Sequence, residues 1–240
     1  MERKTALLAA VDLGRKLGDD LAGRLSNEER AARGSYERWA PKDVFSHATE
    51  WLSRDLERLD IAGGPMPFIG AEELEPANQA IFAEHAKKTW DDVARFFADT
   101  FDAARRRVVE TSPEELERGR ESADGSTRTA WRMIAGHALM HPSPHFGVVY
   151  DRRNEPEMTT ELQESTARAL LDLDDTPEWV GTITYNLACH HALTGNAKRA
   201  IPLLREALTK NPGITDWSKQ DSDFDGIRDD PDFESVYDGT

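Results

Sequence analysis

Apolar residues in the first 155 positions recur at intervals of three and four, and no run of alternating β-branched residues interrupts them. This spacing places apolar side chains on one face of an α-helix, whereas a half-buried strand would alternate with a period of two. We therefore expect this part of the chain to be entirely helical, with an up-and-down bundle as its simplest packing. The principal helical regions are predicted over about 4–25, 40–63, 78–109 and 126–149.

Local signals support several of these boundaries. Pro41 stands at the first position of the second region, where a missing N–H costs nothing, and Gly63-Gly64 ends that region. The third region is expected to restart near Thr89, which precedes two acidic residues typical of a first helical turn. Ser112-Pro113 opens a short turn, and the last helix is predicted to begin near Ser126 or Thr127.

A change in composition divides the chain near residue 155. The segment 151–156 is polar and ends in a proline, as an interdomain linker often does. Residues 156–240 carry 17 acidic and 7 basic side chains, out of 45 and 30 in the whole chain. We therefore predict two domains, over residues 1–155 and 156–240, the second with an acidic tail.

Residues 181–214 follow the spacing of one tetratricopeptide (TPR) repeat, preceded by a partial helix over 160–173. In such a repeat small side chains let two antiparallel helices approach each other, and a proline closes the unit. The matching residues are Ala188, Ala200 and Ala207, the turn Gly195-Asn196 and the closing Pro212. A single repeat cannot bury its own apolar face, so we expect it to dock on the first domain or on a second subunit. Both a packing role and a surface for a protein partner or homodimer stay open.

The acidic tail allows two interpretations. Asp221 to Asp232 matches the oxygen spacing of an EF-hand calcium loop, with Gly226 at the sixth position. Against this, Arg228 stands where the loop needs an apolar residue, and Pro231 intrudes. The alternative is a lid whose apolar side chains pack back on the repeat: Trp217, Phe224, Ile227, Phe233 and Val236.

Composition excludes several classes of function. A net charge of −15 argues against nucleic acid as a partner, because affinity for phosphate backbones comes from cationic side chains. The single cysteine, Cys189, cannot form an internal disulfide, and with His190 and His191 it is interpreted as a packing or surface residue. No apolar run approaches the roughly 20 residues that span a bilayer, so no membrane partner and a cytoplasmic location are expected.

Four histidines of the first domain fall on predicted core-facing stripes: His47, His137, His141 and His145. A spacing of four residues places consecutive imidazoles on one helix face, so two of them could bind one metal ion together with His47 from a facing helix. Three nitrogen ligands leave a coordination position open for chemistry. The alternative is that each is an ordinary hydrogen-bonded core residue.

Two prolines, Pro142 and Pro144, leave the third ligand undecided. If the helix stops there, His137 and His141 are the aligned pair; if it only bends, the pair is His141 and His145. Three other residues are weaker candidates, surface or outer-shell groups that position a ligand or take a proton: Glu50, Glu84 and His85.

The run from Trp39 to Trp51 resembles the second-helix signature of the DinB superfamily of four-helix bundles, particularly its ClbS/DfsB-type branch. Trp131 to Gly136, followed by His141 and His145, is similar to the last helix of that branch, and Asn78 to Phe82 to the opening of its middle helix. The likeness covers about residues 3–150. It implies a metal triad of His47, His141 and His145, with His137 where the branch more often has a smaller polar residue.

Together with the TPR spacing of residues 181–214, the resemblance predicts an all-α chain: a DinB-like four-helix bundle, followed by a short TPR-type hairpin and a capping tail. It also implies a divalent metal, Zn or Ni, and an enzyme that delivers a thiol or water nucleophile to a small electrophile. Such an S-transferase would use a bacterial low-molecular-weight thiol as co-substrate, whereas a hydrolase would use water, and either would serve detoxification or self-resistance. The alternative function is a non-catalytic binding, sequestering or TPR interaction protein.

Overall fold

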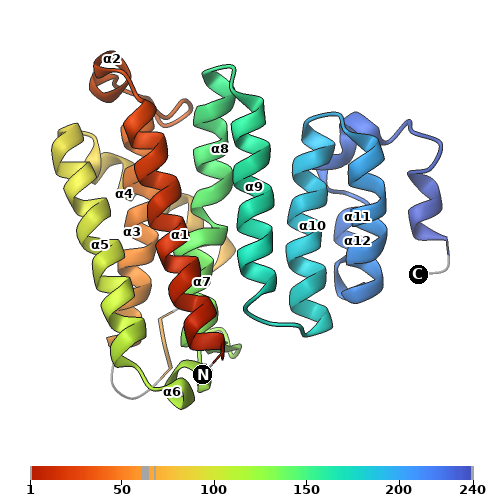
Figure 1. Ribbon diagram of the computed structural model, residues 1–240, viewed down its shortest axis with the longest axis horizontal. Coiled ribbons are helices and arrows are strands. Elements are labelled where there is room, and N and C mark those ends of the chain that lie inside the picture. Colours follow the sequence, from red (N-terminus) through yellow and green to blue (C-terminus); the bar gives the residue numbers. More distant parts are fainter. Residues whose placement is uncertain (1, 61–64, 68, 239–240) are drawn as a thin grey trace. The chain divides into compact units, whose positions relative to one another are not determined.

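The computed structural model describes residues 2–60, 65–67 and 69–238, and nearly all of its regular structure is helical (Figure 1). The all-α class predicted from the sequence is therefore confirmed. The chain divides into two compact units, residues 1–159 and 160–240, and helix α9 (Pro156–Leu171) spans the division. Every helix among the described residues is too short or too polar to cross a bilayer.

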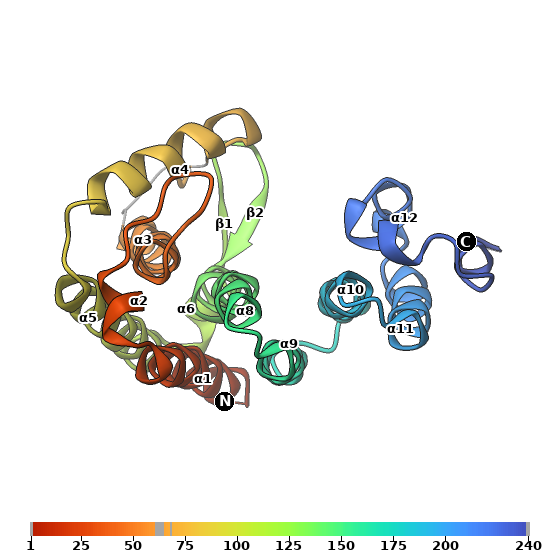
Figure 2. The same cartoon turned by 90° about the horizontal axis from the view of Figure 1, so that it is seen from above.

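The first unit is built from helices that run mostly along one direction (Figures 1 and 2). Its longer helices α1, α3, α5 and the α7–α8 segment pack against one another, while α4 lies against α3. The helical elements are α1 (Glu2–Arg24), α2 (Asn27–Ala31), α3 (Pro41–Asp60), α4 (Ala71–His85), α5 (Trp90–Glu110), α6 (Pro113–Glu117), α7 (Ala130–Ala135), a π-helical turn (Gly136–Met140) and α8 (Pro142–Arg152).

An aromatic core holds these helices together. The Phe45 ring on α3 lies 5.2 Å from Phe97 on α5 and 5.0 Å from Phe146 on α8, all three buried. Helix α1 approaches the π-helical turn so closely that a Cβ at Gly14 would lie 1.9 Å from the Ala138 carbonyl oxygen. The core therefore fixes α3 and the α7–α8 segment beside each other, which matters for the histidines they carry.

Most predicted starts agree with the structure, but α4 begins earlier than expected. It starts at Ala71, so residues 71–77, which precede the third predicted region, are also helical. Glu73 explains this start, because its carboxylate accepts a hydrogen bond of 3.2 Å from the backbone N–H of Gly70. Thr89 caps α5 as predicted, accepting from the backbone N–H of Asp92.

The prediction that this domain is entirely helical, with a last helix from Ser126 or Thr127, is wrong in one place. Strands β1 (Gly119–Glu121) and β2 (Thr127–Thr129) form an antiparallel hairpin, and α7 begins only after it. The turn explains the hairpin: Gly125 has φ +78°, and Asp124 accepts a hydrogen bond from the Ser126 N–H. Met66 lies along the hairpin, its N–H donating to the Glu121 carbonyl at 2.8 Å.

The last helical segment of the first unit passes through both prolines. The His141 N–H donates to the Gly136 carbonyl, five residues back, at 2.7 Å, which makes one wide π turn. Pro142 then occupies the first position of α8, where no backbone donor is needed. The helix therefore neither stops nor breaks, and His141 and His145 stay one turn apart.

The second unit contains a helical hairpin of α10 (Pro177–Leu193) and α11 (Ala197–Lys210). Gly195 turns the chain with φ +70°, and the small residues at the crossing are fully buried: Ala188, Ala200 and Ala207. The tail continues through helix α12 (Thr215–Ser218) and three 3-10 turns, Pro212–Ile214, Ser222–Ile227 and Glu234–Tyr237.

The tail packs on this hairpin through four of the five apolar residues expected in a lid: Phe224, Ile227, Phe233 and Val236. Trp217 is 66 % exposed, so its assignment to the lid is wrong. The carboxylates do not gather as a calcium loop would require. Asp225 pairs with Arg228 at 2.8 Å, and among the described residues neither Asp225 nor Asp232 joins Asp221 in a group of close metal-ligating atoms.

Candidate metal centre

Three imidazoles from two separate stretches of the first unit meet at one point. His47 comes from the buried face of α3, His141 follows the π-helical turn, and His145 lies one turn later on α8. The Nε2 atom of His141 lies 3.1 Å from Nε2 of His47 and 3.2 Å from Nε2 of His145. The ligand atoms of this histidine triad all lie within 4.8 Å of one another.

Hydrogen bonding alone does not account for this convergence. An imidazole nitrogen offers one site in the ring plane, either an N–H or a lone pair. Nε2 of His141 can therefore make one linear hydrogen bond, yet two other Nε2 atoms approach it at 3.1 and 3.2 Å. A tetrahedral ion with zinc–nitrogen bonds of 2.0–2.1 Å separates its nitrogen ligands by about 3.3 Å. The spacing of the triad is close to that of a shared cation.

Burial keeps all three imidazoles neutral. Desolvation, aided by the nearby His145 and His137, lowers the pKa of His47 to about 3. Desolvation also lowers the pKa of His145 to about 4, and together with the neighbouring imidazoles it lowers the pKa of His141 well below its ordinary value. Neutral imidazole is the form that binds metal, so the triad is ready to ligate at neutral pH.

Aromatic side chains, rather than carboxylates, orient the triad. The Trp39 ring lies 4.5 Å from His47 and stacks on His145 at 5.8 Å. Nδ1 of His47 and Nδ1 of His141 are buried, and neither has a hydrogen-bond partner among the residues that the structure describes. Metal-binding histidines usually donate that N–H to a carboxylate or carbonyl, so this site departs from the common pattern in its outer shell while its inner donor set fits a divalent ion.

His137 lies beside the triad but does not join it. Its Nδ1 is 2.5 Å from Oδ2 of Asp55, and its ring stacks on Trp51 at 5.8 Å. The ring centroids of His137 and His141 are 5.2 Å apart. The sequence left two pairs open, His137 with His141 and His141 with His145. The structure places the second pair next to His47.

Asp55 is a functional candidate that the sequence analysis missed. Its buried carboxylate accepts from Arg58 at 2.9 Å as well as facing His137. A signal was present, because Asp55 follows His47 by eight residues and lies on the same helical face, among apolar side chains. A carboxylate in an apolar stripe requires a partner, and His137 provides one.

Glu50 and His85 form a separate pair. His85 is buried, so its interpretation as a surface residue is wrong, and its Nε2 lies 3.2 Å from Oε2 of Glu50. The hydrogen bond from His85, with a further one from Arg54, lowers the pKa of Glu50 to about 2 against the effect of burial. Glu84 is exposed, and its carboxylate lies close enough to Glu50 and His85 for the three to form a group of potential metal ligands.

In the second unit Cys189 lies near Asp221 and Asp223. Burial raises the pKa of the Cys189 thiol, so the sulfur keeps its proton, and the Tyr185 hydroxyl donates to Asp221 at 2.6 Å. His191 is buried in the same helix. The contacts of Cys189 are those of a packed core thiol rather than of a reactive one.

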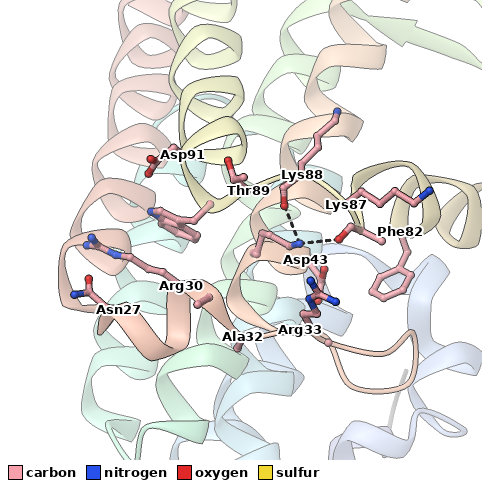
Figure 3. Close-up of a pocket in the computed structure, with 15 residues that line it drawn as sticks. Asn27, Arg30, Ala32, Arg33, Asp43, Phe82, Lys87, Lys88, Thr89 and Asp91 are labelled. Atoms are coloured by element: carbon pink, nitrogen blue, oxygen red, sulfur yellow. Dashed lines mark hydrogen bonds between the residues drawn. The ribbon is translucent and has the colours of Figure 1, made fainter.

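Two cavities differ in their relation to the triad. One of about 440 Å³ is lined by His137 and His141. A larger one of about 820 Å³ is lined by none of the triad histidines (Figure 3). There the Lys42 ammonium donates to the carbonyls of Ala86 and Lys88, both at 3.0 Å. The side chains of Lys87 and Lys88 extend away from that ammonium group (Figure 3). Of these two cavities, the smaller one thus includes a histidine of the triad, His141, in its lining.

Comparison of the chain with family models, curated proteins and solved structures found no match.

Proposed function

We propose that the first unit is a DinB-like four-helix bundle of the ClbS/DfsB type, with α1, α3, α5 and the α7–α8 segment as its four helices. The mutual packing of these elements around the Phe45 cluster supports this assignment. The α10–α11 hairpin is proposed to be a TPR-type unit, because its three small residues are buried at the crossing: Ala188, Ala200 and Ala207.

We propose that His47, His141 and His145 hold one divalent ion, Zn²⁺ or Ni²⁺. The observation that carries this proposal is the approach of two Nε2 atoms, at 3.1 and 3.2 Å, to the single in-plane site of His141 Nε2. Neutral imidazoles suit both ions, and three protein ligands leave room for a further ligand.

The proposed activity is transfer of a thiol or water nucleophile to a small electrophile, as an S-transferase or a hydrolase. A divalent ion supplies Lewis acidity, which favours the anionic form of such a nucleophile. The protein itself positions the groups around the ion: the Trp39 and Trp51 rings lie against His47, and Asp55 holds the His137 imidazole beside the triad. The cavity of about 440 Å³ has the size of a small-molecule site.

Metal analysis of the purified protein tests this proposal. Wild type prepared without chelator should carry one Zn or Ni per chain, and His47→Ala and His141→Ala should each lose at least nine tenths of it. His137→Ala is the matched control, because its imidazole is committed to Asp55, and it should keep the metal. Stoichiometric metal in both triad variants, or none in wild type, contradicts the proposal and leaves the non-catalytic binding role.

Activity is tested separately with the metal-loaded protein. Thiol conjugation to 1-chloro-2,4-dinitrobenzene, with cysteine or glutathione as co-substrate, should proceed faster with wild type than with His47→Ala. Equal rates for the two proteins would remove the catalytic part of the proposal even where the metal binds.

A further inference from the structure

A third pocket of the first unit, of about 270 Å³, gathers arginines although the chain as a whole is strongly acidic. Its charged lining consists of four arginines, Arg33, Arg38, Arg152 and Arg153, and one carboxylate, Glu29. The net charge of the chain is −15, from 45 acidic and 30 basic residues. Like charges repel one another, so four guanidinium groups around one concave surface favour an anionic ligand there.

Local structure brings these arginines together from two parts of the chain. Arg33 and Arg38 belong to the connection between α2 and α3, which folds back on itself because the backbones of Ser35 and Arg38 exchange two hydrogen bonds of 3.1 Å. Arg152 is the last residue of α8. Its guanidinium donates to the Trp39 carbonyl, which ties the end of α8 to that connection.

The acids nearest in the sequence to this connection are already committed to other groups. Glu29 pairs with Arg153, so the one carboxylate of the lining is balanced within the fold. Asp43 lines the larger cavity together with Arg33 (Figure 3). Its carboxylate is buried and accepts a hydrogen bond of 2.9 Å from the Ala40 N–H, without an ion pair to Arg33.

The other three arginines of the pocket have no carboxylate partner in the part of the chain that the structure describes. Arg152 donates to the neutral Trp39 carbonyl. The side chains of Arg33 and Arg38 make neither a hydrogen bond nor an ion pair with the described residues. Three guanidinium groups therefore present unused N–H donors and uncompensated positive charge at one pocket.

This excess of charge favours a phosphate group over a carboxylate. A phosphate monoester carries a charge of about −1.5 to −2 at pH 7 and three strong acceptor oxygens, whereas a carboxylate has a single charge and two oxygens. Guanidinium groups bind such oxygens through paired, charge-assisted hydrogen bonds. An extended polyanion, such as a nucleic acid, would also meet the acidic remainder of the surface, so a small molecule fits better.

We infer that this arginine pocket binds the phosphate group of a small molecule, with Arg33, Arg38 and Arg152 around the phosphate oxygens. The lining of the pocket includes none of the triad histidines, so the inference does not rest on the metal. The two sites are neighbours, because Trp39 lines the pocket and its ring lies 4.5 Å from that of His47.

Calorimetric titration of the full-length protein in EDTA tests the inference, since EDTA removes any metal that would itself bind phosphate. Phenyl phosphate should bind at least five times more tightly than benzenesulfonate, which has the same ring and three oxygens but a single charge. Inorganic phosphate, titrated in parallel, distinguishes the free ion from an ester as the source of the group. Equal affinity for phenyl phosphate and benzenesulfonate overturns the inference, as does a dissociation constant above about 1 mM for both phosphate probes.

A pair of charge variants separates pocket contacts from general electrostatics. Arg33→Gln/Arg38→Gln changes two exposed side chains, so it should keep the wild-type urea midpoint while its affinity for phenyl phosphate falls at least tenfold. Arg95→Gln/Arg106→Gln removes the same charge from exposed residues of α5 outside the pocket, and it should keep the wild-type affinity within twofold. An equal loss in both double variants overturns the inference. Metal content, measured before EDTA is added, tests the proposed function separately.

Discussion

Acidification should destabilise the metal-free protein, because His47 is buried, His141 and His145 are partly buried, and this desolvation makes the triad resist protonation. In the unfolded chain a histidine has its ordinary pKa of about 6.5. In the folded protein burial lowers the pKa of His145 to about 4 and that of His47 to about 3. The unfolded state therefore binds more protons between these values, and the stability present above pH 6.5 is lost as the pH falls toward 4.

The magnitude follows from the width of that interval. A pH of 5 lies about 1.5 units below the ordinary histidine pKa. Protonation therefore stabilises the unfolded chain relative to the folded one by about 2 kcal/mol at each of these two histidines. The two together amount to about 4 kcal/mol, a large part of the 5–15 kcal/mol that stabilises a typical domain. The triad should thus dominate the response of the first unit to mild acid.

Urea unfolding in the presence of EDTA measures this effect. The free energy of unfolding of wild type should fall by at least about 4 kcal/mol from pH 8 to pH 5, because the lowered pKa of His141 acts in the same direction. In His145→Gln the glutamine does not titrate, so the decrease in the free energy of unfolding over the same pH range should be smaller by about 2 kcal/mol. The same pH dependence in wild type and His145→Gln, or an increase in stability on acidification, would refute this reasoning.

Three further outcomes are expected. Gly14→Ala should lower the free energy of unfolding by about 2 kcal/mol, because its Cβ would lie 1.9 Å from the Ala138 carbonyl oxygen. In Gly23→Ala, in the same helix, the new Cβ meets nothing within 4 Å, so this control should not destabilise the protein. Urea unfolding compares the two variants. Thr89→Ala should cost about 1 kcal/mol in the same assay, because it removes the cap of α5, and no change would contradict that role. Cys189 should react with 5,5′-dithiobis(2-nitrobenzoate) only in denaturant, because burial raises its pKa; rapid reaction of the native protein would contradict the packing described.

Local signals explain which parts of the fold were predictable. The starts of α3 and α5 depend on Pro41 and on the Thr89 cap, and both signals act within a few residues of the chain. The amphipathic stripes placed His47 and His141 on buried faces for the same reason. Such features need no knowledge of what packs against them.

Features that depend on distant contacts were not predictable in this way. The β1–β2 hairpin is only three residues per strand and is accompanied by Met66, far away in sequence, although Asp124-Gly125 is a recognisable turn signal. The burial of His85 depends on its pairing with Glu50. The choice between His137 and His145 depends on a π turn that the prolines alone do not specify.

X-ray absorption at the zinc edge tests the central claim most directly. Zinc-loaded wild type should show nitrogen or oxygen neighbours at about 2.0–2.1 Å with the outer-shell scattering of three imidazoles, and His145→Ala should show two. Sulfur at about 2.3 Å, which would indicate Cys189, or identical imidazole scattering in wild type and His145→Ala, would contradict a metal held by His47, His141 and His145.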